Sequence, residues 1–219
     1  MNTVQQYAHI DGWKPGAGPR IGDLRKIESM ARISHRSEDA QTDDSWKRFI
    51  DAVVVKHGDW SVVEHVSTSV MAYVDRGVQQ EWTRHRLFSF TIESTRFVNY
   101  DKKMPASFIR PPGMTEEQSM IWDDVIAGSE EGYKKMIRAG AAPQIARSVF
   151  PLGLGSLMGV TSNLRNWRHM FIMRTTKEAH PQYREVAIPL LAEFQEAYPI
   201  LFDDIVPMQR QIDNLRLPR

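Results

Sequence analysis

The sequence predicts an α+β fold, a mixed sheet flanked by helices, in a single domain that spans residues 1–219. One segment alternates apolar and polar residues with the period of a strand, and several others repeat apolar residues with the period of a helix. The length of 219 residues suits one domain with a sizeable core. The chain contains no cysteine, which excludes disulfides, thiolate zinc sites and a cysteine nucleophile.

The expected elements follow from local patterns of apolar residues, capping residues and breakers. Residues 1–22 are rich in glycine and proline and predict an irregular lead-in. Residues Thr42 to Ser45 are suited to capping the second helix, and Gly77 separates the first strand from the helix after it. Helices are expected at 24–36, 42–56, 78–86, 115–138, 143–150, 163–174 and 180–198, and strands at 66–74, 97–100 and 156–163.

The charge balance limits the kind of partner. The chain has 28 basic and 27 acidic residues, which argues against a dedicated nucleic-acid binder but allows a local anion pocket. No apolar run of membrane-spanning length and no signal-peptide pattern is visible, so a cytoplasmic protein without a membrane partner is expected. The seven histidines show no paired ligand spacing, so no metal site is expected.

The stretch with most chemical information is Arg84-His85-Arg86, followed ten residues later by Arg96. Arginine holds phosphate or carboxylate with a planar fork that stays charged. If the helix at 78–86 runs to its end, Arg84 and Arg86 point about 200° apart and serve two ligands or two subunits. The alternative interpretation is a solvated helix end, in which these cations complement the helix dipole or pair with surface acids such as Glu81 and Glu93.

Arg84-His85-Arg86, then seven residues, then Ser94 resembles the signature of the flavin-dependent thymidylate synthases. Ser89 and Arg96 also match the pattern. Three further blocks fit in order and spacing, and the resemblance covers roughly residues 57–100 and 146–185. These blocks are Ser61-Val62-Val63-Glu64-His65, Ala146-Arg147-x-x-x-Pro151-Leu152, and Asn163 to Arg174.

This resemblance implies the thymidylate synthase-complementing protein fold and a homotetramer whose active sites are shared between subunits. It implies an enzyme that holds FAD and converts dUMP to dTMP. NADPH would reduce the flavin, and 5,10-methylenetetrahydrofolate would supply the one-carbon unit. The other class of thymidylate synthase attacks the pyrimidine with a cysteine thiolate, which this chain lacks.

The resemblance also implies roles for individual residues. The flavin would be held by Ser61, Arg84, His85, Arg86, Asn163, Arg165 and His169. The nucleotide would be bound by Glu81, Arg84, Ser94, Arg96, Arg147 and Arg174. Arg174 is the expected catalytic residue. It would lie by the pyrimidine, favour the ionised N3 form, and stabilise the negative charge that develops as C5 becomes nucleophilic.

The sequence departs from the family pattern at several positions. Ile92 stands where the family commonly has Glu or Gln, Glu81 where it often has Gln, and His169 where it has an asparagine. Two alternatives therefore remain. One is a non-catalytic relative that binds FAD or a nucleotide. The other is an RNA-binding module with a basic and aromatic patch, formed by Arg84, Arg86, Phe88, Phe90 and Arg96.

Overall fold

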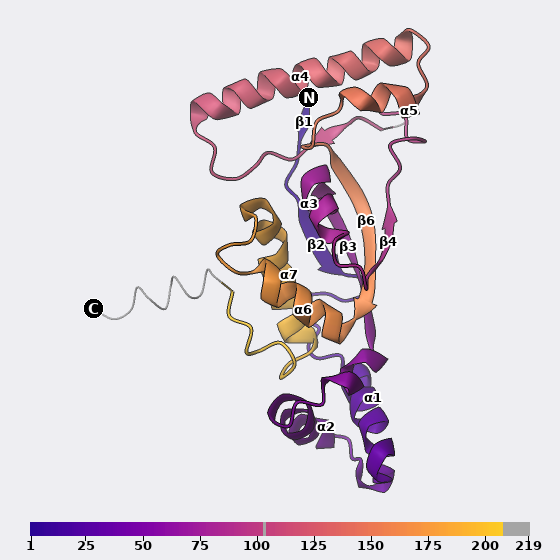
Figure 1. Cartoon of the computed structure of the whole chain (residues 1–219), viewed down its shortest axis with the longest axis vertical. Helices are drawn as coiled ribbons and strands as arrows, with labels where there is room; N and C mark the ends of the chain where they lie inside the picture. Colours follow the sequence, from indigo (N-terminus) through magenta and orange to yellow (C-terminus); the bar gives the residue numbers. More distant parts are fainter. Residues whose placement is uncertain (103, 208–219) are drawn as a thin grey trace, which may run out of the picture. The chain divides into compact units, whose positions relative to one another are not determined.

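The computed structural model describes residues 1–102 and 104–207 (Figure 1). These residues form two compact units. Unit 1 contains Met1–Tyr7, Met71–Arg86 and Phe90–Gly159. Unit 2 contains Ala8–Val70, Leu87–Ser89 and the described residues from Val160 on. Helices and open sheets both occur, so the predicted α+β class is confirmed. The assignment of residues 1–219 to a single domain stays a prediction.

Two sheets contain the strands. A four-stranded sheet has the order β2-β3-β6-β4, and a two-stranded parallel sheet pairs β1 with β5. The strands are β1 (Asn2–Thr3), β2 (Tyr7–Ile10), β3 (Ser67–Asp75), β4 (Ser89–Ile92), β5 (Ser107–Phe108) and β6 (Gly155–Asn163). The strands predicted at 66–74 and 156–163 are confirmed. The prediction that residues 1–22 are irregular is wrong at β1 and β2. Both strands are short, and local patterns did not reveal them because their pairing partners, β5 and β3, lie far along the chain.

The long strand β3 shows the alternation that predicted it. Thr68, Val70, Ala72 and Val74 are buried, whereas the residues between them are partly exposed. In unit 1, the ring of Tyr73 on β3 passes so close to β6 that a Cβ at Gly155 would lie 2.5 Å from it. This close approach requires glycine at position 155.

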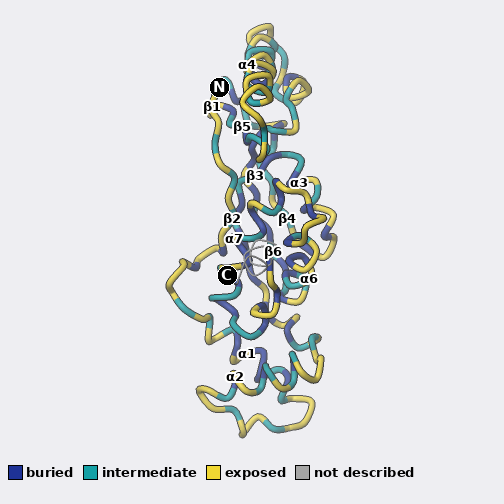
Figure 2. The backbone as a smooth tube through the Cα atoms, turned by 90° about the vertical axis from the view of Figure 1, so that its left-hand side faces the viewer, coloured by how far each residue is buried: buried dark blue, intermediate teal, exposed yellow. Residues whose placement is uncertain are grey.

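Unit 1 contains α3 (Arg76–Trp82), α4 (Glu116–Arg138), α5 (Pro143–Ala146) and a 3₁₀ segment at Arg147–Val149. A capping box formed by Thr115 and Gln118 begins α4. Beside α4 and α5, the ring of Phe150 stacks on Tyr133 with centroids 4.4 Å apart, within an aromatic core. The outer side of α4 is exposed to solvent (Figure 2).

Two predictions for this unit are wrong, namely the strand at 97–100 and the burial of Ile145 and Val149 in the helix at 143–150. Residues 97–100 form turns and no strand, because the carbonyl of Ser94 accepts hydrogen bonds from the amides of Phe97 and Val98. The helix at 143–150 is α5 followed by the short 3₁₀ segment, and its expected apolar residues Ile145 and Val149 are exposed. Ala146 is the residue of α5 that is fully buried.

Unit 2 contains the other helices of the described residues. They are α1 (Ile21–Arg32), α2 (Ser45–Phe49) with a π-helical continuation at Ile50–Lys56, α6 (Leu164–Arg174) and α7 (Pro181–Ala197), with 3₁₀ segments at Ile33–His35, Glu38–Ala40 and Trp60–His65. The helices predicted at 24–36, 42–56, 163–174 and 180–198 are confirmed with shifted ends. Helix α6 packs on α7 through Trp167, Phe171 and Phe194. None of the helices in the described ranges is long and apolar enough to cross a bilayer.

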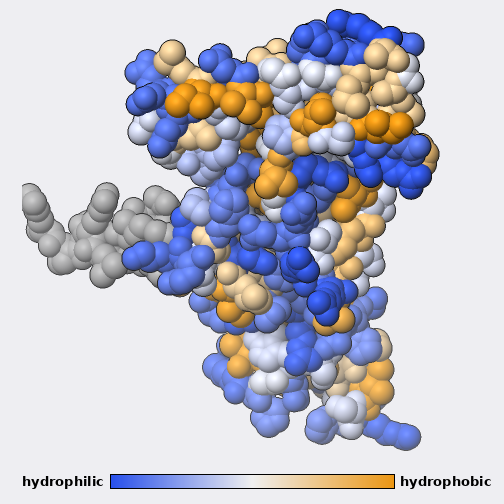
Figure 3. Space-filling model, turned by 45° about the horizontal axis from the view of Figure 1, so that its top comes forward, coloured by the Kyte–Doolittle hydropathy of each residue, from blue (hydrophilic) through white to orange (hydrophobic). Residues whose placement is uncertain are grey.

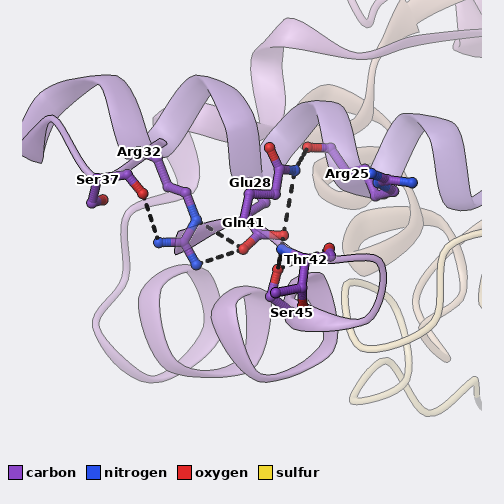
Figure 4. A network of polar contacts seen from close by, with 7 residues as sticks. All are labelled: Arg25, Glu28, Arg32, Ser37, Gln41, Thr42 and Ser45. Atoms are coloured by element: carbon purple, nitrogen blue, oxygen red, sulfur yellow. Dashed lines mark hydrogen bonds and ion pairs between the residues drawn. The ribbon is translucent and has the colours of Figure 1, made fainter. Parts of the chain in front are cut away.

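A buried polar network joins α1 to the start of α2 (Figure 4). Glu28 is fully buried, and Arg32 donates to its Oε1 from both Nε and Nη2. Ser45 donates to the other carboxylate oxygen at 2.9 Å. The predicted capping of α2 takes a different form. The side chain of the N-cap residue Asp44 accepts from Nζ of Lys47 and not from a helix amide, and the Ser45 hydroxyl accepts from the amide of Thr42.

Candidate functional site

The predicted site residues fall into two sets, one in each unit. Unit 1 holds Glu81, Arg84, His85, Arg86, Ser94, Arg96 and Arg147, and unit 2 holds Ser61, Asn163, Arg165, His169 and Arg174. In unit 1, the aspartate Asp75 begins α3 by accepting a hydrogen bond from the amide of Val78 at 2.6 Å. This cap places Arg76 inside the helix, although the sequence had suggested a boundary at Gly77.

The Arg-His-Arg stretch does not continue α3. The helix ends at Trp82, and the amides of Arg84 and His85 each bond to the carbonyl three residues earlier. Such bonds tighten the end of a helix into a turn. The prediction that Arg84 and Arg86 project about 200° apart from a helix is therefore wrong, because both lie in the turns beyond it.

Within these turns His85 is buried, whereas Arg84 and Arg86 are exposed. Neither arginine forms an ion pair with any residue in the described parts of the chain. The alternative that they neutralise surface acids is not supported by these contacts. Two unpaired guanidinium groups on one short turn suit a ligand with two phosphate charges.

A second turn brings Arg147 to the Ser94-Thr95-Arg96 segment. Arg147 donates from Nη1 to Oγ1 of Thr95 at 3.0 Å, and Thr95 is buried. The hydroxyl of Ser94 accepts from the amide of Arg96 at 3.4 Å, and the Arg96 guanidinium lies 5.5 Å from the ring centroid of exposed Phe97. Three residues predicted to bind the nucleotide, Ser94, Arg96 and Arg147, therefore belong to one small region.

Glu93, which follows the apolar Ile92, supports this turn. Its Oε1 accepts from the hydroxyl of Tyr100 at 2.6 Å, and its Oε2 accepts from the amide of Leu157 at 3.2 Å. Burial and the hydrogen bond to Glu93 raise the pKa of the Tyr100 hydroxyl, so Tyr100 stays protonated as the donor. The carboxylate at position 93 thus anchors the segment that leads into Ser94.

A pocket of about 460 Å³ lies beside Arg147. Of the predicted site residues of unit 1, only Arg147 lines it, and Glu81 does not. Sequence reasoning missed Arg76, Gln80 and Thr95. The signal for the first two was Asp75, because an N-cap there makes Arg76 and Gln80 one helical turn apart on α3. The lining residues are Arg76, Gln80, Thr95, Gln144, Arg147, Ser148, Phe150, Pro151, Leu152 and Leu154.

In unit 2, the start of α6 packs on the 3₁₀ segment that carries Ser61. Asn163 caps the helix by accepting from the amide of Asn166 at 2.9 Å. Arg165 forms an ion pair with Glu64, which is three residues beyond the exposed Ser61. The predicted residues Ser61, Asn163 and Arg165 are therefore brought together in unit 2.

His169 and Arg174 lie farther along α6. His169 is exposed and stands four residues after Arg165, so the two share one face of the helix. Arg174 follows Arg165 by nine residues and points about 180° away from it around the axis. Its guanidinium lies 5.0 Å from the ring centroid of Tyr183 on α7. Arg174 is thus separated from the other predicted residues of unit 2.

The residues of each set fit the groups that the resemblance implies. The turn at Arg84 and Arg86 offers two exposed cations for the diphosphate of a dinucleotide, and Ser61 and His169 offer exposed polar groups. The basic and aromatic patch proposed for RNA is incomplete, because Phe88 is buried against Trp167 with ring centroids 4.8 Å apart. Phe88 is therefore not available to stack on a base.

Comparisons with known proteins agree with the family resemblance drawn from the sequence. The family model described as thymidylate synthase complementing protein matches residues 21–200. The flavin-dependent thymidylate synthase of Sulfurisphaera tokodaii is 30% identical over 198 residues, which cover 84% of this chain and 74% of that protein. The protein of the same name from Pyrococcus furiosus is 29% identical over 196 residues, covering 84% and 78%.

A third relative of that name, from Mycobacteroides abscessus, is 30% identical over 205 residues, which cover 85% of this chain and 79% of the relative. The matched range 21–200 includes every residue of both predicted sets. The resemblance drawn from Arg84-His85-Arg86 and Ser94 is therefore confirmed. The chain belongs to the thymidylate synthase complementing protein family.

Proposed function

We propose that this protein is a flavin-dependent thymidylate synthase, an enzyme that methylates dUMP to dTMP with FAD bound. The observation that carries the proposal is the family match over residues 21–200, within which the Arg84-His85-Arg86 and Ser94 signature is intact. The exposed and unpaired guanidinium groups of Arg84 and Arg86 support it for the described part of the chain, because they are available to an anionic cofactor.

In this proposal the flavin is held by residues of both sets. Arg84 and Arg86 bind the diphosphate, and buried His85 belongs to the same turn. Ser61, Asn163, Arg165 and His169 contribute from the same subunit or from a neighbouring one. When bound, FAD supplies the hydride chemistry, and NADPH and 5,10-methylenetetrahydrofolate are the co-substrates. The protein's own contribution is to bind, align and place charge.

The nucleotide is bound by Glu81, Arg84, Ser94, Arg96, Arg147 and Arg174. Ser94 is a neutral donor, and Arg96 and Arg147 pair with the phosphate. The positive charge of the Arg174 guanidinium favours the pyrimidine that has lost its N3 proton. It stabilises the charge that develops on the ring as C5 becomes nucleophilic.

We further propose a cytoplasmic homotetramer whose active sites are shared between subunits, without nucleic-acid or membrane partners. Exposed apolar side chains support subunit contacts, because large apolar patches on a protein surface mark interaction sites. Met120, Ile121 and Val125 of α4 are 59–65% exposed, and Ile145 of α5 and Leu152 are exposed as well. Figure 3 shows apolar surface gathered over the region of α4 and α5.

The first experiment is to purify the protein and record its absorbance. A yellow preparation with FAD stoichiometric to the chain is expected. Tritium release from 5-tritiated dUMP, given NADPH and methylenetetrahydrofolate, then tests the reaction. Release above that of a boiled sample supports the proposal. A flavin-containing protein with no release would be the non-catalytic relative, and a protein that neither binds FAD nor releases tritium would overturn the proposal.

A further inference from the structure

The pocket beside Arg147 contains a second arginine that the family resemblance does not assign. Arg76 and Gln80 stand one helical turn apart on α3 and both line the pocket. The amide of Arg76 donates to the carbonyl of Leu152 at 2.9 Å, and Leu152 lines the same pocket. This bond ties the backbone of Arg76 to another residue of the pocket lining.

The charges of the pocket are unbalanced. Arg76 and Arg147 line it, whereas no carboxylate is among its lining residues in the described chain. Neither arginine forms an ion pair within the described ranges. The carboxylate of Glu93 is already bonded to Tyr100 and Leu157. Two guanidinium groups that share one pocket repel each other unless an anion enters between them.

The remaining walls indicate the kind of anion. Gln80, Gln144 and Ser148 add neutral polar residues, and the apolar part of the lining consists of Phe150, Pro151, Leu152 and Leu154. The volume of about 460 Å³ is in the range of small-molecule sites. Two guanidinium forks match a dianionic phosphate monoester, and the apolar part of the lining suits a ring or a sugar face.

We propose that Arg76 is a substrate-binding residue that, together with Arg147, holds the phosphate of a nucleoside monophosphate in this pocket. The identification of that ligand with dUMP rests on the proposed function. The anion site itself rests on the two arginines, the hydrogen bond from Arg147 to Thr95, and the acid-free lining. Arg76 then determines specificity for the phosphorylated form of the substrate over the nucleoside.

The test compares Arg76→Gln with the control Arg138→Gln, an exposed arginine of α4 outside this pocket. Binding of dUMP and of deoxyuridine to the FAD-loaded protein is measured by calorimetry, which needs no turnover. Arg76→Gln is expected to weaken dUMP binding roughly tenfold to a hundredfold, because a charged hydrogen-bond donor is lost. Deoxyuridine binding, FAD content and melting temperature are expected to match those of the wild type. Arg76→Lys is expected to restore part of the dUMP affinity.

Equal dUMP affinity in wild type and Arg76→Gln would overturn the proposal, as would equal weakening of dUMP and deoxyuridine. A raised KM for the folate with an unchanged KM for dUMP would also overturn it, and would assign the pocket to a carboxylate tail. If the wild-type protein binds dUMP but releases no tritium, the proposed function is refuted. The comparison of dUMP binding between wild type and Arg76→Gln still decides the role of Arg76. Wild-type protein that binds no dUMP would overturn both.

Discussion

Arg147 donates a hydrogen bond from Nη1 to Oγ1 of Thr95 over 3.0 Å, and so joins the segment after α5 to the turn that follows β4. The bond holds the guanidinium at a buried hydroxyl beside the turn of Ser94 and Arg96. An arginine fixed in this way presents its remaining N–H groups in one orientation, which lowers the entropy lost when it binds an anion.

Replacing Thr95 by valine tests this arrangement. Thr95→Val removes the acceptor with little change in shape, so the unfolding free energy is expected to fall by about 1 kcal/mol. The KM for dUMP is expected to rise several-fold while kcat changes little, since Arg147 loses orientation and not charge. Steady-state kinetics and urea unfolding measure both effects. Thr91→Val, at an exposed position on β4, is the control, and an unchanged KM in Thr95→Val would contradict the prediction.

Replacing Arg86 by alanine tests the flavin site. Arg86 is exposed and unpaired within the described residues, so the stability of the apoprotein is expected to change by less than about 0.5 kcal/mol. FAD retention is expected to weaken roughly tenfold or more, because a charged donor to the diphosphate is removed. The FAD content after dialysis is the measurement, with Arg48→Ala on α2 as the control. Full flavin retention in Arg86→Ala would assign Arg86 a different role.

Replacing Arg174 by alanine separates binding from chemistry. The cation–π contact with Tyr183 contributes about 0.5–1 kcal/mol, so the variant is expected to fold and keep its flavin. Turnover is expected to fall by about 100-fold or more, because the charge that stabilises the ionised pyrimidine is gone. Tritium release and FAD absorbance are measured on the same sample, and Lys177→Ala serves as an exposed control. Normal turnover would show that Arg174 is not catalytic.

The ion pair between Arg168 and Asp204 gives a pH-dependent prediction. The hydrogen bonds from Arg168 lower the pKa of Asp204 below its usual value of 3.8. The stabilisation is therefore complete above pH 3.8 and is lost as the pH falls through the lower pKa of the folded state. Asp204→Asn is expected to cost roughly 1 kcal/mol or less at neutral pH, because the Asp204 side chain is half exposed.

The difference in unfolding free energy between wild type and Asp204→Asn is expected to become smaller as the pH is lowered. Urea unfolding at neutral pH and at about pH 3 measures it. Asp43→Asn, an exposed partner of Arg25, is the control for loss of a surface charge. A difference that stays constant between the two pH values would contradict the linkage argument.

The sequence contained enough information for the elements with a strong local period. Strand β3 was predicted because its buried residues alternate, and α6 because Leu164, Trp167 and Phe171 share one face. The turn beyond Trp82 and the turns at residues 97–100 were missed. Their conformation depends on hydrogen bonds to Trp82 and Ser94 that periodicity does not reveal.

The candidate site was predicted only in part, for a similar reason. The signature located Arg84 and Ser94, and a separate block of the resemblance located Arg147. The structure brings Arg147 to the segment that contains Ser94. Arg76 belongs to no family motif. It lies in α3 because that helix, capped by Asp75, begins two residues before the expected start at Val78. The sequence also did not predict that Ile145 is exposed, because an apolar residue in a helix does not by itself show which helix face is buried.

The central claim is that guanidinium groups from separate parts of the chain surround two phosphate-bearing ligands in the assembled protein. A crystal structure of the protein with FAD and dUMP tests it most directly. We expect Arg84, Arg96, Arg147 and Arg174, from one subunit or from neighbouring ones, to lie within contact distance of the two ligands. An assembly in which these arginines stand tens of ångströms apart, even across subunits, would contradict the claim.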